Sequence, residues 1–262
     1  MSYRTKNLAV VAAVLITLVM TGCRTFDLLR ARDQLNKGVT AYEAKRYPEA
    51  GEHFQRSIEL DPNLTHAYLY LAATYRAQFV PGAQSEENLQ AAQRAIASYQ
   101  EVLEKDPTNE SAMASIANIH SGLENYEEAK KWYRKRAEVD PVDPEPWYGI
   151  ATVNWQLAYD ETGRTGENVE NLSEEKKVEV SQLVEEGITS LQKALELNPQ
   201  YFEAMEYLNL LYREKAKLAE NEEEHDKWRR EADKLALQAL ELKRKQAAEA
   251  EAARNQPFQP AP

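Results

Sequence analysis

The segment Glu110–Asp143, ESAMASIANIHSGLENYEEAKKWYRKRAEVDPVD, contains two helical patterns separated by a short polar break. Apolar residues recur at helical spacing on both sides of the break. They are Met113, Ile116 and Ala117 before it, and Ala129, Tyr133 and Ala137 after it. The second pattern ends at Asp140 and Pro141, because proline lacks the backbone N–H and its ring clashes with the preceding turn of a helix. The segment therefore predicts two helices joined by a tight connection.

The same helix stop occurs four times along the chain. The four stops are Leu60-Asp61-Pro62, Lys105-Asp106-Pro107, Val139-Asp140-Pro141 and Leu197-Asn198-Pro199. A small residue stands twelve positions before each proline. These small residues are Ala50, Ala95, Ala129 and Gly187. Because the stop and the spacing both repeat, the chain is predicted to consist of copies of one structural unit.

The 34-residue segment resembles a tetratricopeptide repeat (TPR) in its length and in its small and aromatic positions. The resemblance covers most of the chain and implies an all-α TPR solenoid of about five helix–turn–helix repeats. The repeats are expected at residues 31–64, 65–109, 110–143, 144–201 and 202–244, followed by a helical cap that ends at residue 254.

Repeats two, four and five exceed the period of the family, and the extra residues lie between their paired helices. Ser85, Ser173 and Asn221 have side chains that can cap a following helix. The second helix is therefore expected to be extended in these three repeats. In repeat five the excess is expected near residues 219–227.

Residues 1–22 read as an export signal rather than as part of the fold. Arg4 and Lys6 precede the apolar run Leu8–Met20, which is shorter than the roughly 20 residues needed to span a bilayer. A basic start followed by a short apolar run is typical of a secretory signal. The signal ends in Met20-Thr21-Gly22-Cys23, which resembles the lipobox of bacterial lipoproteins.

Cys23 is the only cysteine in the chain, so it cannot form an internal disulfide. One interpretation is a small buried hydrophobe or a free thiol. Its place directly after the signal favours the other, in which the sulfur carries a palmitate-type lipid. Residues 23–30 would then be the lipidated N-terminus and a short linker. Since Arg24 follows the cysteine, the resemblance implies the periplasmic face of the outer membrane if the organism is diderm.

Residues 255–262 contain three prolines and are expected to form a disordered tail. The chain has a formal charge of −11, and removal of residues 1–22, with two positive charges, makes it −13. An acidic protein is repelled by nucleic acid, so no nucleic-acid partner is expected. The acidic runs 168–186 and 220–226 are either solvated helix faces or a patch for a basic partner.

No catalytic, metal-binding or cofactor-binding constellation is found in the sequence. The histidines His53, His66, His120 and His225 lie in different repeats without the spacing of metal ligands. The run Gly163–Gly166 lacks the Lys-Ser/Thr of a phosphate loop and reads as a turn. We therefore expect a protein that is not an enzyme and has no cofactor.

The TPR resemblance implies that the first helix of each repeat lines an inner, concave surface. The residues placed there as candidates for partner binding are Tyr42, Tyr70, Arg76, Asn118, Tyr148, Trp155, Tyr207 and Arg213. Aromatic rings with a polar tip are enriched at binding surfaces, although rings here could instead pack against neighbouring helices. Leu35, Val39, Tyr70, Ser111 and Ser115 stand where chaperone-binding relatives need lysine and asparagine. An apolar or mixed peptide is therefore the expected ligand.

These features predict a lipid-anchored protein–protein interaction scaffold of the bacterial cell envelope, which binds a segment of another envelope protein in its groove. A role in envelope protein assembly fits the resemblance. The alternative is a self-associating lipoprotein whose inserted helices form the interface, so that a homo-oligomer stays open. An enzymatic function would require a metal or cofactor to copurify.

Overall fold

The computed structural model describes residues 24–254, which are predominantly helical and contain no strand. The expected all-α class is therefore confirmed. The predicted export signal, the lipidation site Cys23 and the predicted tail 255–262 lie outside the described residues. None of the helices within residues 24–254 is both long and apolar enough to cross a bilayer.

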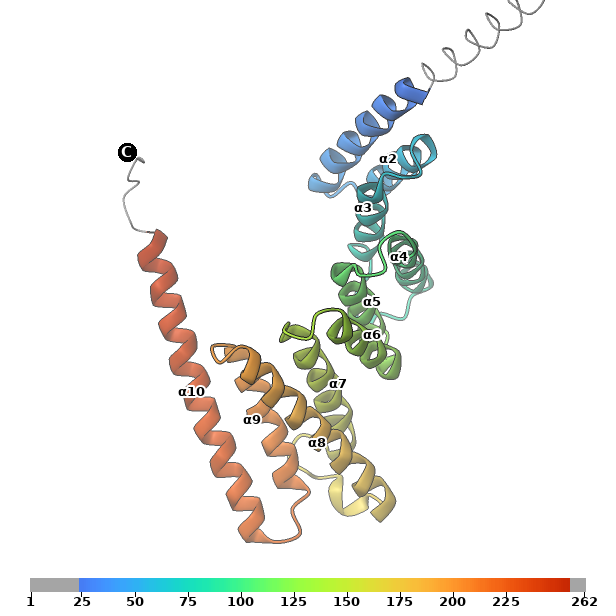
Figure 1. Ribbon diagram of the computed structural model, residues 1–262. Coiled ribbons are helices and arrows are strands. Elements are labelled where there is room, and N and C mark those ends of the chain that lie inside the picture. Colours follow the sequence, from blue (N-terminus) through green and yellow to red (C-terminus); the bar gives the residue numbers. More distant parts are fainter. Residues whose placement is uncertain (1–23, 255–262) are drawn as a thin grey trace, which may run out of the picture. The chain divides into compact units, whose positions relative to one another are not determined.

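The chain divides into two compact units between Glu124 and Asn125, inside the expected third repeat. The first unit begins with a helix over residues 24–43 and continues with four helices shown in Figure 1. They are α2 (Tyr47–Leu60), α3 (Thr65–Arg76), α4 (Glu86–Lys105) and α5 (Glu110–Gly122). Within this unit α3 packs against both α2 and α4, and α4 packs against α5.

The second unit contains five α-helices and one short 3-10 helix among its described residues. They are α6 (Tyr126–Val139), α7 (Glu145–Thr162), η1 (Val169–Asn171), α8 (Glu174–Leu197), α9 (Phe202–Lys217) and α10 (Glu222–Arg254). Each α-helix packs against the next one along the chain, and α7 also packs against α9. The first helices of the expected fourth and fifth repeats therefore lie side by side.

The repeated stop has a second physical cause besides proline. In each stop the Asp or Asn before the proline has left the helical conformation, and its side-chain Oδ1 accepts the backbone N–H two residues further on. The four distances are 3.1 Å for Asp61–Asn63, 3.3 Å for Asp106–Thr108, 3.1 Å for Asp140–Val142 and 3.0 Å for Asn198–Gln200. The intervening proline has no N–H to satisfy, so this short turn suits the Asp/Asn-Pro pair.

Small residues allow close approach between helices within each unit. Ala50 and Ala95 are fully buried in the first unit, and Ala129 is fully buried in the second. A Cβ atom on Gly149 of α7 would lie 2.6 Å from the ring of Tyr133 in α6. A Cβ on Gly187 of α8 would lie 2.7 Å from Leu211 of α9, so both glycines are required by packing.

The expected extension of the second helices is confirmed. α4, α8 and α10 have 20, 24 and 33 residues, whereas α2 and α6 have 14 each. All three expected capping side chains accept a backbone N–H three residues further on. The distances are 3.2 Å for Ser85–Asn88, 3.2 Å for Ser173–Lys176 and 2.9 Å for Asn221–Glu224. The caps thus start the long helices where the sequence predicts.

The excess of repeat five is mostly helical, in agreement with the expected extension of its second helix. α9 runs to Lys217 and α10 begins at Glu222, so only residues 218–221 separate the helices. The extra residues are helical because Asn221 caps α10 at once. The excess of repeat two, by contrast, forms an ordered connection that Asn88 holds. Its Oδ1 accepts the N–H of Val80 over 2.6 Å, and its Nδ2 donates to the carbonyl of Ala83 over 2.8 Å.

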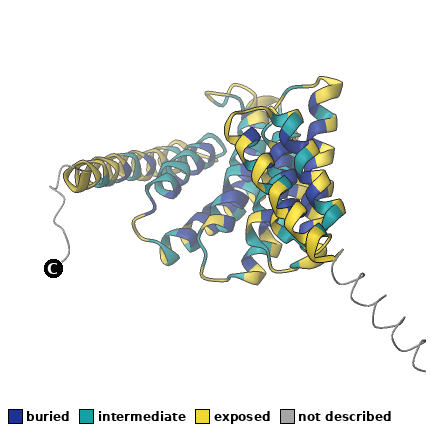
Figure 2. Ribbon diagram, turned by 90° about the horizontal axis from the view of Figure 1, so that it is seen from above, coloured by how far each residue is buried: buried dark blue, intermediate teal, exposed yellow. Residues whose placement is uncertain are grey.

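Buried residues lie on the facing sides of the helices, as the dark blue segments of Figure 2 show. The main core of the second unit is built from α7, α8 and α9, and includes Val180, Leu191 and Leu211. α10 contributes only Ala232 and Ala239 as buried residues and is otherwise largely exposed.

Candidate functional site

A row of touching aromatic rings follows α7 and α9 in the second unit. Its members in order of contact are Tyr201, Tyr148, Tyr207, Trp155 and Tyr159. Successive ring centroids are 5.2, 5.3, 5.5 and 5.3 Å apart. Tyr207 meets both Tyr148 and Trp155 edge to face, which is a favoured geometry for aromatic pairs. We call these five residues the aromatic row.

The helical period explains how the row forms. Tyr148, Trp155 and Tyr159 are spaced by seven and four residues, so they share one face of α7. Tyr207 lies on α9, which packs beside α7. Tyr148, Trp155 and Tyr207 are partly buried and pack against the main core of this unit. Each ring therefore packs against the core and is also partly exposed to solvent. The two alternatives, packing against neighbouring helices and lining a binding surface, are thus compatible for these rings.

Burial raises the pKa of two tyrosine hydroxyls in the aromatic row. Burial raises the pKa of Tyr148 well above its ordinary value, and the nearby Tyr207 and Glu203 raise it further. Burial likewise raises the pKa of Tyr201, with an added effect of Glu145. These two hydroxyls therefore keep their protons at neutral pH, so each can donate a hydrogen bond.

Three of the expected groove residues of the first unit have neighbours in the structure. Tyr42 and Arg76 lie near the hydroxyl of Tyr99, and Tyr70 lies against Phe54. Burial raises the pKa of Tyr99, a hydrogen bond with Ser115 and the nearby charge of Arg76 lower it, and Tyr42 is close enough to raise it. Tyr70 stacks on Phe54 with ring centroids 5.3 Å apart. Asn118, the fourth expected residue of this unit, is exposed on α5.

Arg213 is engaged by the C-terminal helix. Its Nε donates to Asn209 Oδ1 over 3.0 Å, and its terminal nitrogen pairs with Asp233 of α10 over 2.7 Å. Tyr212 and Trp228 make a second link between α9 and α10, with centroids 5.3 Å apart. The sequence predicted that Arg213 lines the groove but gave no sign that α10 supplies its partner.

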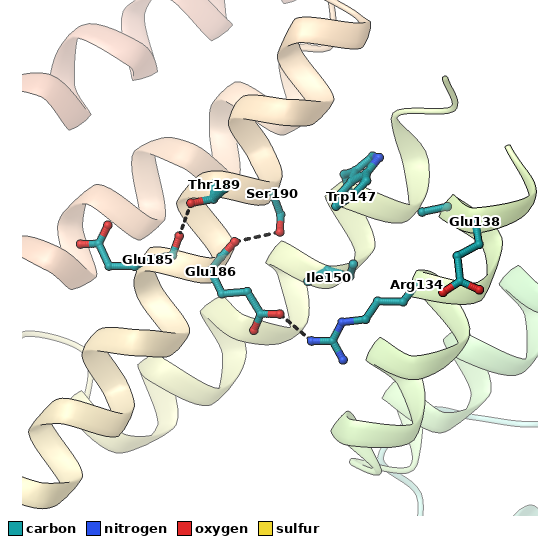
Figure 3. Close-up of a pocket in the computed structure, with 9 residues that line it drawn as sticks. Arg134, Glu138, Trp147, Ile150, Glu185, Glu186, Thr189 and Ser190 are labelled. Atoms are coloured by element: carbon teal, nitrogen blue, oxygen red, sulfur yellow. Dashed lines mark hydrogen bonds and ion pairs between the residues drawn. The ribbon is translucent and has the colours of Figure 1, made fainter. Parts of the chain in front are cut away.

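The second unit also contains a pocket of about 550 Å³ that no sequence signal predicted, shown in Figure 3. Its residues come from α6, α7 and α8, with Trp147, Ile150 and Ala137 as apolar members. Trp147 Nε1 is buried there and has no hydrogen-bond partner among the residues that the structure describes. At its edge Arg134 pairs with Glu186 over 2.6 Å, as the dashed line in Figure 3 marks.

Glu186 is the centre of a polar network beneath this pocket. Its Oε2 accepts from Asn154 Nδ2 over 2.9 Å and from Lys130 over 3.3 Å. Burial alone would raise the pKa of Glu186, but hydrogen bonds from Asn154 and Arg134 lower it below the ordinary value. Glu186 is therefore ionised at neutral pH. The pairs are far apart in the sequence, so no periodic signal could have revealed them.

Many charges of the acidic run 168–186 are paired. Lys176 bridges Glu161 over 2.9 Å and Glu179 over 3.3 Å. Lys177 pairs with Glu174 over 2.8 Å. Within residues 24–254, no three His, Cys, Asp or Glu side chains gather in a way that could hold a metal ion.

Comparison with known proteins agrees with this architecture. The tetratricopeptide repeat family matches residues 89–152. The chain is 26% identical over 125 residues to Hsp70-Hsp90 organizing protein 1 of Glycine max, and 25% identical over 125 residues to Hsp70-Hsp90 organizing protein 3 of Arabidopsis thaliana. Each match covers 48% of this chain and 20% of the relative, so the chain spans about a fifth of the length of these proteins.

Solved structures match over a larger share of the chain. A crystal structure of MamA is 16% identical, covers 88% of this chain and 98% of its own, and has a TM-score of 0.58. MamA residues 41 to the end from Desulfovibrio magneticus RS-1 are 18% identical. This match covers 83% of this chain and 97% of that structure, with a TM-score of 0.56. YrrB, described as a TPR protein with an unusual peptide-binding site, is 15% identical. This match covers 80% of this chain and 90% of that structure, with a TM-score of 0.50. At these identities the likeness shows the fold alone.

The fold is thus an all-α TPR solenoid, as the sequence predicted. The family match covers residues 89–152, and proteins with this fold generally act as protein–protein interaction scaffolds. Proteins built from such repeats are generally non-enzymatic scaffolds.

Proposed function

We propose that this chain is a lipid-anchored interaction scaffold of the bacterial cell envelope, which holds a segment of a partner protein on the aromatic row. The observation that carries the proposal is the uninterrupted ring contact from Tyr148 through Tyr207 to Trp155, at 5.3 and 5.5 Å. These residues lie on the first helices of two successive repeats, where the family resemblance places a binding surface.

The row is suited to binding because its geometry is already fixed. Each ring contacts another ring, and Tyr148, Trp155 and Tyr207 also pack against the core. Binding costs free energy when side chains must be ordered, so rings that are held in place lose little freedom. Their partly exposed edges offer apolar area, and the protonated hydroxyl of Tyr148 offers a hydrogen bond to a bound backbone.

The membrane anchor in this proposal rests on the sequence. Cys23 follows an export-type signal directly, and the first described helix begins at residue 24. A lipid on Cys23 would thus hold the first repeat close to the bilayer surface. The partner would then be another protein of the same envelope.

Self-association is a second candidate, favoured by the surface of α10. Leu237 and Leu240 are 64% and 42% exposed on a helix that buries few side chains. A second copy could cover them. Sedimentation of residues 24–262 over a wide concentration range tests this, since a monomer at every concentration would exclude it.

The main experiment locates the partner segment by crosslinking. A photoreactive phenylalanine analogue replaces Tyr207 in one strain and Trp132 of α6 in a control strain, and mass spectrometry identifies crosslinked segments from intact cells. We expect one partner segment at position 207 that is absent from position 132. Trp132 is a fair control because it is an aromatic residue of the same unit that does not belong to the aromatic row.

Binding of that segment is then measured with purified variants. Trp155→Ala combined with Tyr148→Ala should weaken it by at least about 2 kcal/mol, on the scale of interface hot spots. Trp132→Ala should leave it unchanged, and circular dichroism verifies the helicity of each variant. Glutamine in place of Glu222, Glu223 and Glu224 should matter only at low salt, where exposed charges are poorly screened. Loss of binding in the glutamine variant, with retention in the aromatic variant, would move the binding surface to α10.

A further inference from the structure

A second cavity of the second unit lies at the Trp155–Tyr159 end of the aromatic row. Its volume is about 350 Å³, and it is lined by α7, α9, the start of α10 and the connection after α7. Trp155 and Tyr159 are its aromatic members, with ring centroids 5.3 Å apart. Arg164, Arg213, Lys217 and Arg229 are its cationic members, and Glu214 is its only carboxylate. We call this the cationic cavity.

Two of the four cations are already neutralised inside the protein. Lys217 lies 2.7 Å from Glu214, and both side chains are largely buried. Arg213 pairs with Asp233 over 2.7 Å. These pairs have no charge left for a ligand and serve to hold the walls of the cavity together.

The other two cations have no partner of this kind. Among residues 24–254, neither the Arg164 nor the Arg229 side chain makes an ion pair or a hydrogen bond, and both are exposed. They enter the cavity from different segments, since Arg164 belongs to the connection after α7 and Arg229 to α10. The cavity therefore presents two uncompensated guanidinium groups in a chain whose formal charge is −11.

The backbone that carries Arg164 is fixed in place. The N–H of Arg164 donates to Glu167 Oε1 over 3.1 Å, and the N–H of Thr165 donates to Glu167 Oε2 over 2.6 Å. The carbonyl of Gly163 accepts from Lys217 Nζ over 2.7 Å. The connection after α7 is thus hydrogen-bonded to Lys217 of α9 and, through Glu167, to its own backbone. Its backbone therefore loses little conformational freedom when a ligand binds Arg164.

We infer that the cationic cavity binds the side-chain carboxylate of an acidic residue that stands next to an apolar residue in a peptide segment. Guanidinium groups form planar, paired hydrogen bonds with carboxylates, which suits Arg164 and Arg229. The neighbouring apolar side chain would lie on Trp155 and Tyr159. A volume of about 350 Å³ is near the lower end for ligand pockets, so it admits one or two side chains. This inference rests on the proposed function and specifies the chemistry of the partner.

The test is selection from a random peptide library displayed at the N-terminus of a phage coat protein, so that no peptide has a free C-terminus. The bait is residues 24–262 as purified protein. Wild-type bait should enrich peptides with Asp or Glu within two positions of an apolar residue. Arg164→Glu combined with Arg229→Glu should instead enrich Lys or Arg there. The matched control, Arg230→Glu with Lys234→Glu, makes the same charge change on α10 outside the cavity and should select as wild type does.

A defined probe follows from the best wild-type peptide, synthesised with a fluorescent label and an amidated C-terminus. Replacing its acidic residue by the amide should weaken binding to wild type about tenfold or more, as expected for a lost charge-assisted hydrogen bond. The same replacement should change binding to the charge-reversed variant little or improve it.

The outcomes separate this inference from the proposed function. Enriched peptides without an acidic preference, whose binding still needs Tyr148 and Trp155, would overturn the inference alone. An acidic preference that survives charge reversal would place the carboxylate elsewhere and overturn it as well. Failure of the wild-type chain to enrich any peptide would count against both.

Discussion

Lys217 Nζ lies 2.7 Å from Glu214 Oε1 in a pair whose side chains are only 12% and 3% exposed. The same ammonium donates to the carbonyl of Gly163 over 2.7 Å, and the hydroxyl of Thr162 donates to Glu214 Oε2 over 2.6 Å. One buried pair therefore joins α9 to the end of α7 and to the connection that follows it. Buried charges are tolerated only when they are paired and hydrogen-bonded, and this pair meets both conditions.

Lys217→Met should destabilise the protein by about 3–5 kcal/mol, because it leaves the Glu214 carboxylate buried without a cation. Urea unfolding followed by circular dichroism measures the loss. The control is Lys193→Met, which removes an i,i+3 pair with Glu196 whose side chains are 39% and 70% exposed, and should cost about 0–1 kcal/mol. Adding Glu214→Leu to Lys217→Met should recover most of the stability. Equal losses in the two lysine variants would mean that the 214–217 pair is not buried.

Gly38→Ala should destabilise the first unit by about 1–3 kcal/mol through overpacking. A Cβ atom at this position would lie 2.5 Å from the ring of Phe54, which is fully buried among other side chains. That clash outweighs the gain of about 1 kcal/mol that alanine normally brings to a helix.

Gly51→Ala is the matched control for Gly38→Ala. Gly51 is also helical and buried, but a Cβ there would meet only Thr74 at 3.9 Å and Leu71 at 4.0 Å. Alanine should therefore stabilise at this position by about 0.5–1 kcal/mol. Thermal unfolding of both variants gives the comparison, and opposite signs are the expected result. A stabilising Gly38→Ala would show that the first helix does not approach Phe54 as closely as described.

Alkaline pH should unfold the second unit through its buried tyrosines. Burial raises the pKa of Tyr133 to about 12, with Arg136 opposing and Glu145 adding to the shift. A raised pKa means that the stabilisation is complete below the ordinary pKa of about 10 and is lost as the pH rises through 12. The loss attributable to Tyr133 is about 2–3 kcal/mol. Unfolding midpoints measured from pH 8 to 12 should fall less steeply for Tyr133→Phe than for wild type, and identical slopes would contradict this.

Local signals explain which parts of the fold could be predicted. The helix stops at Pro62 and Pro107, and the caps at Ser85 and Ser173, act over a few residues, so the sequence reveals them directly. The length of the second helices follows from those caps. The cap at Asn221 likewise predicts the start of the long helix α10 at Glu222.

The candidate site was predictable only in part. Tyr148, Trp155 and Tyr207 were predicted because the TPR resemblance implies that the first helix of each repeat lines the binding surface, and the structure brings their rings into contact. Arg164 and Arg229 were missed because the cationic cavity depends on how a connection and α10 meet α9. Such pairings between distant segments leave no period in the sequence. The polar partners of Glu186 were missed for the same reason.

Cys23→Ser should release the protein from the membrane fraction, because in the proposed anchor the acyl chains are attached only through the sulfur and the new N-terminus of that residue. Fractionation of cells, followed by immunoblotting of washed membranes and the soluble fraction, measures the distribution. Mass spectrometry of the wild-type N-terminus should show cleavage before Cys23 and the mass of attached acyl chains. Cys23→Ala serves as a second variant, so that an effect of the serine hydroxyl on signal processing can be recognised.

The control for release is a wild-type sample washed with high salt and with carbonate, which strip proteins held by charge or by other proteins. Wild-type protein should resist both washes, since acyl chains hold it through buried CH₂ groups rather than through charge. A Cys23→Ser protein that has lost its signal yet stays in washed membranes would exclude lipidation as the anchor. The protein would then have to be held at the membrane by the partner that binds the aromatic row. The crosslinking at position 207 would identify that partner.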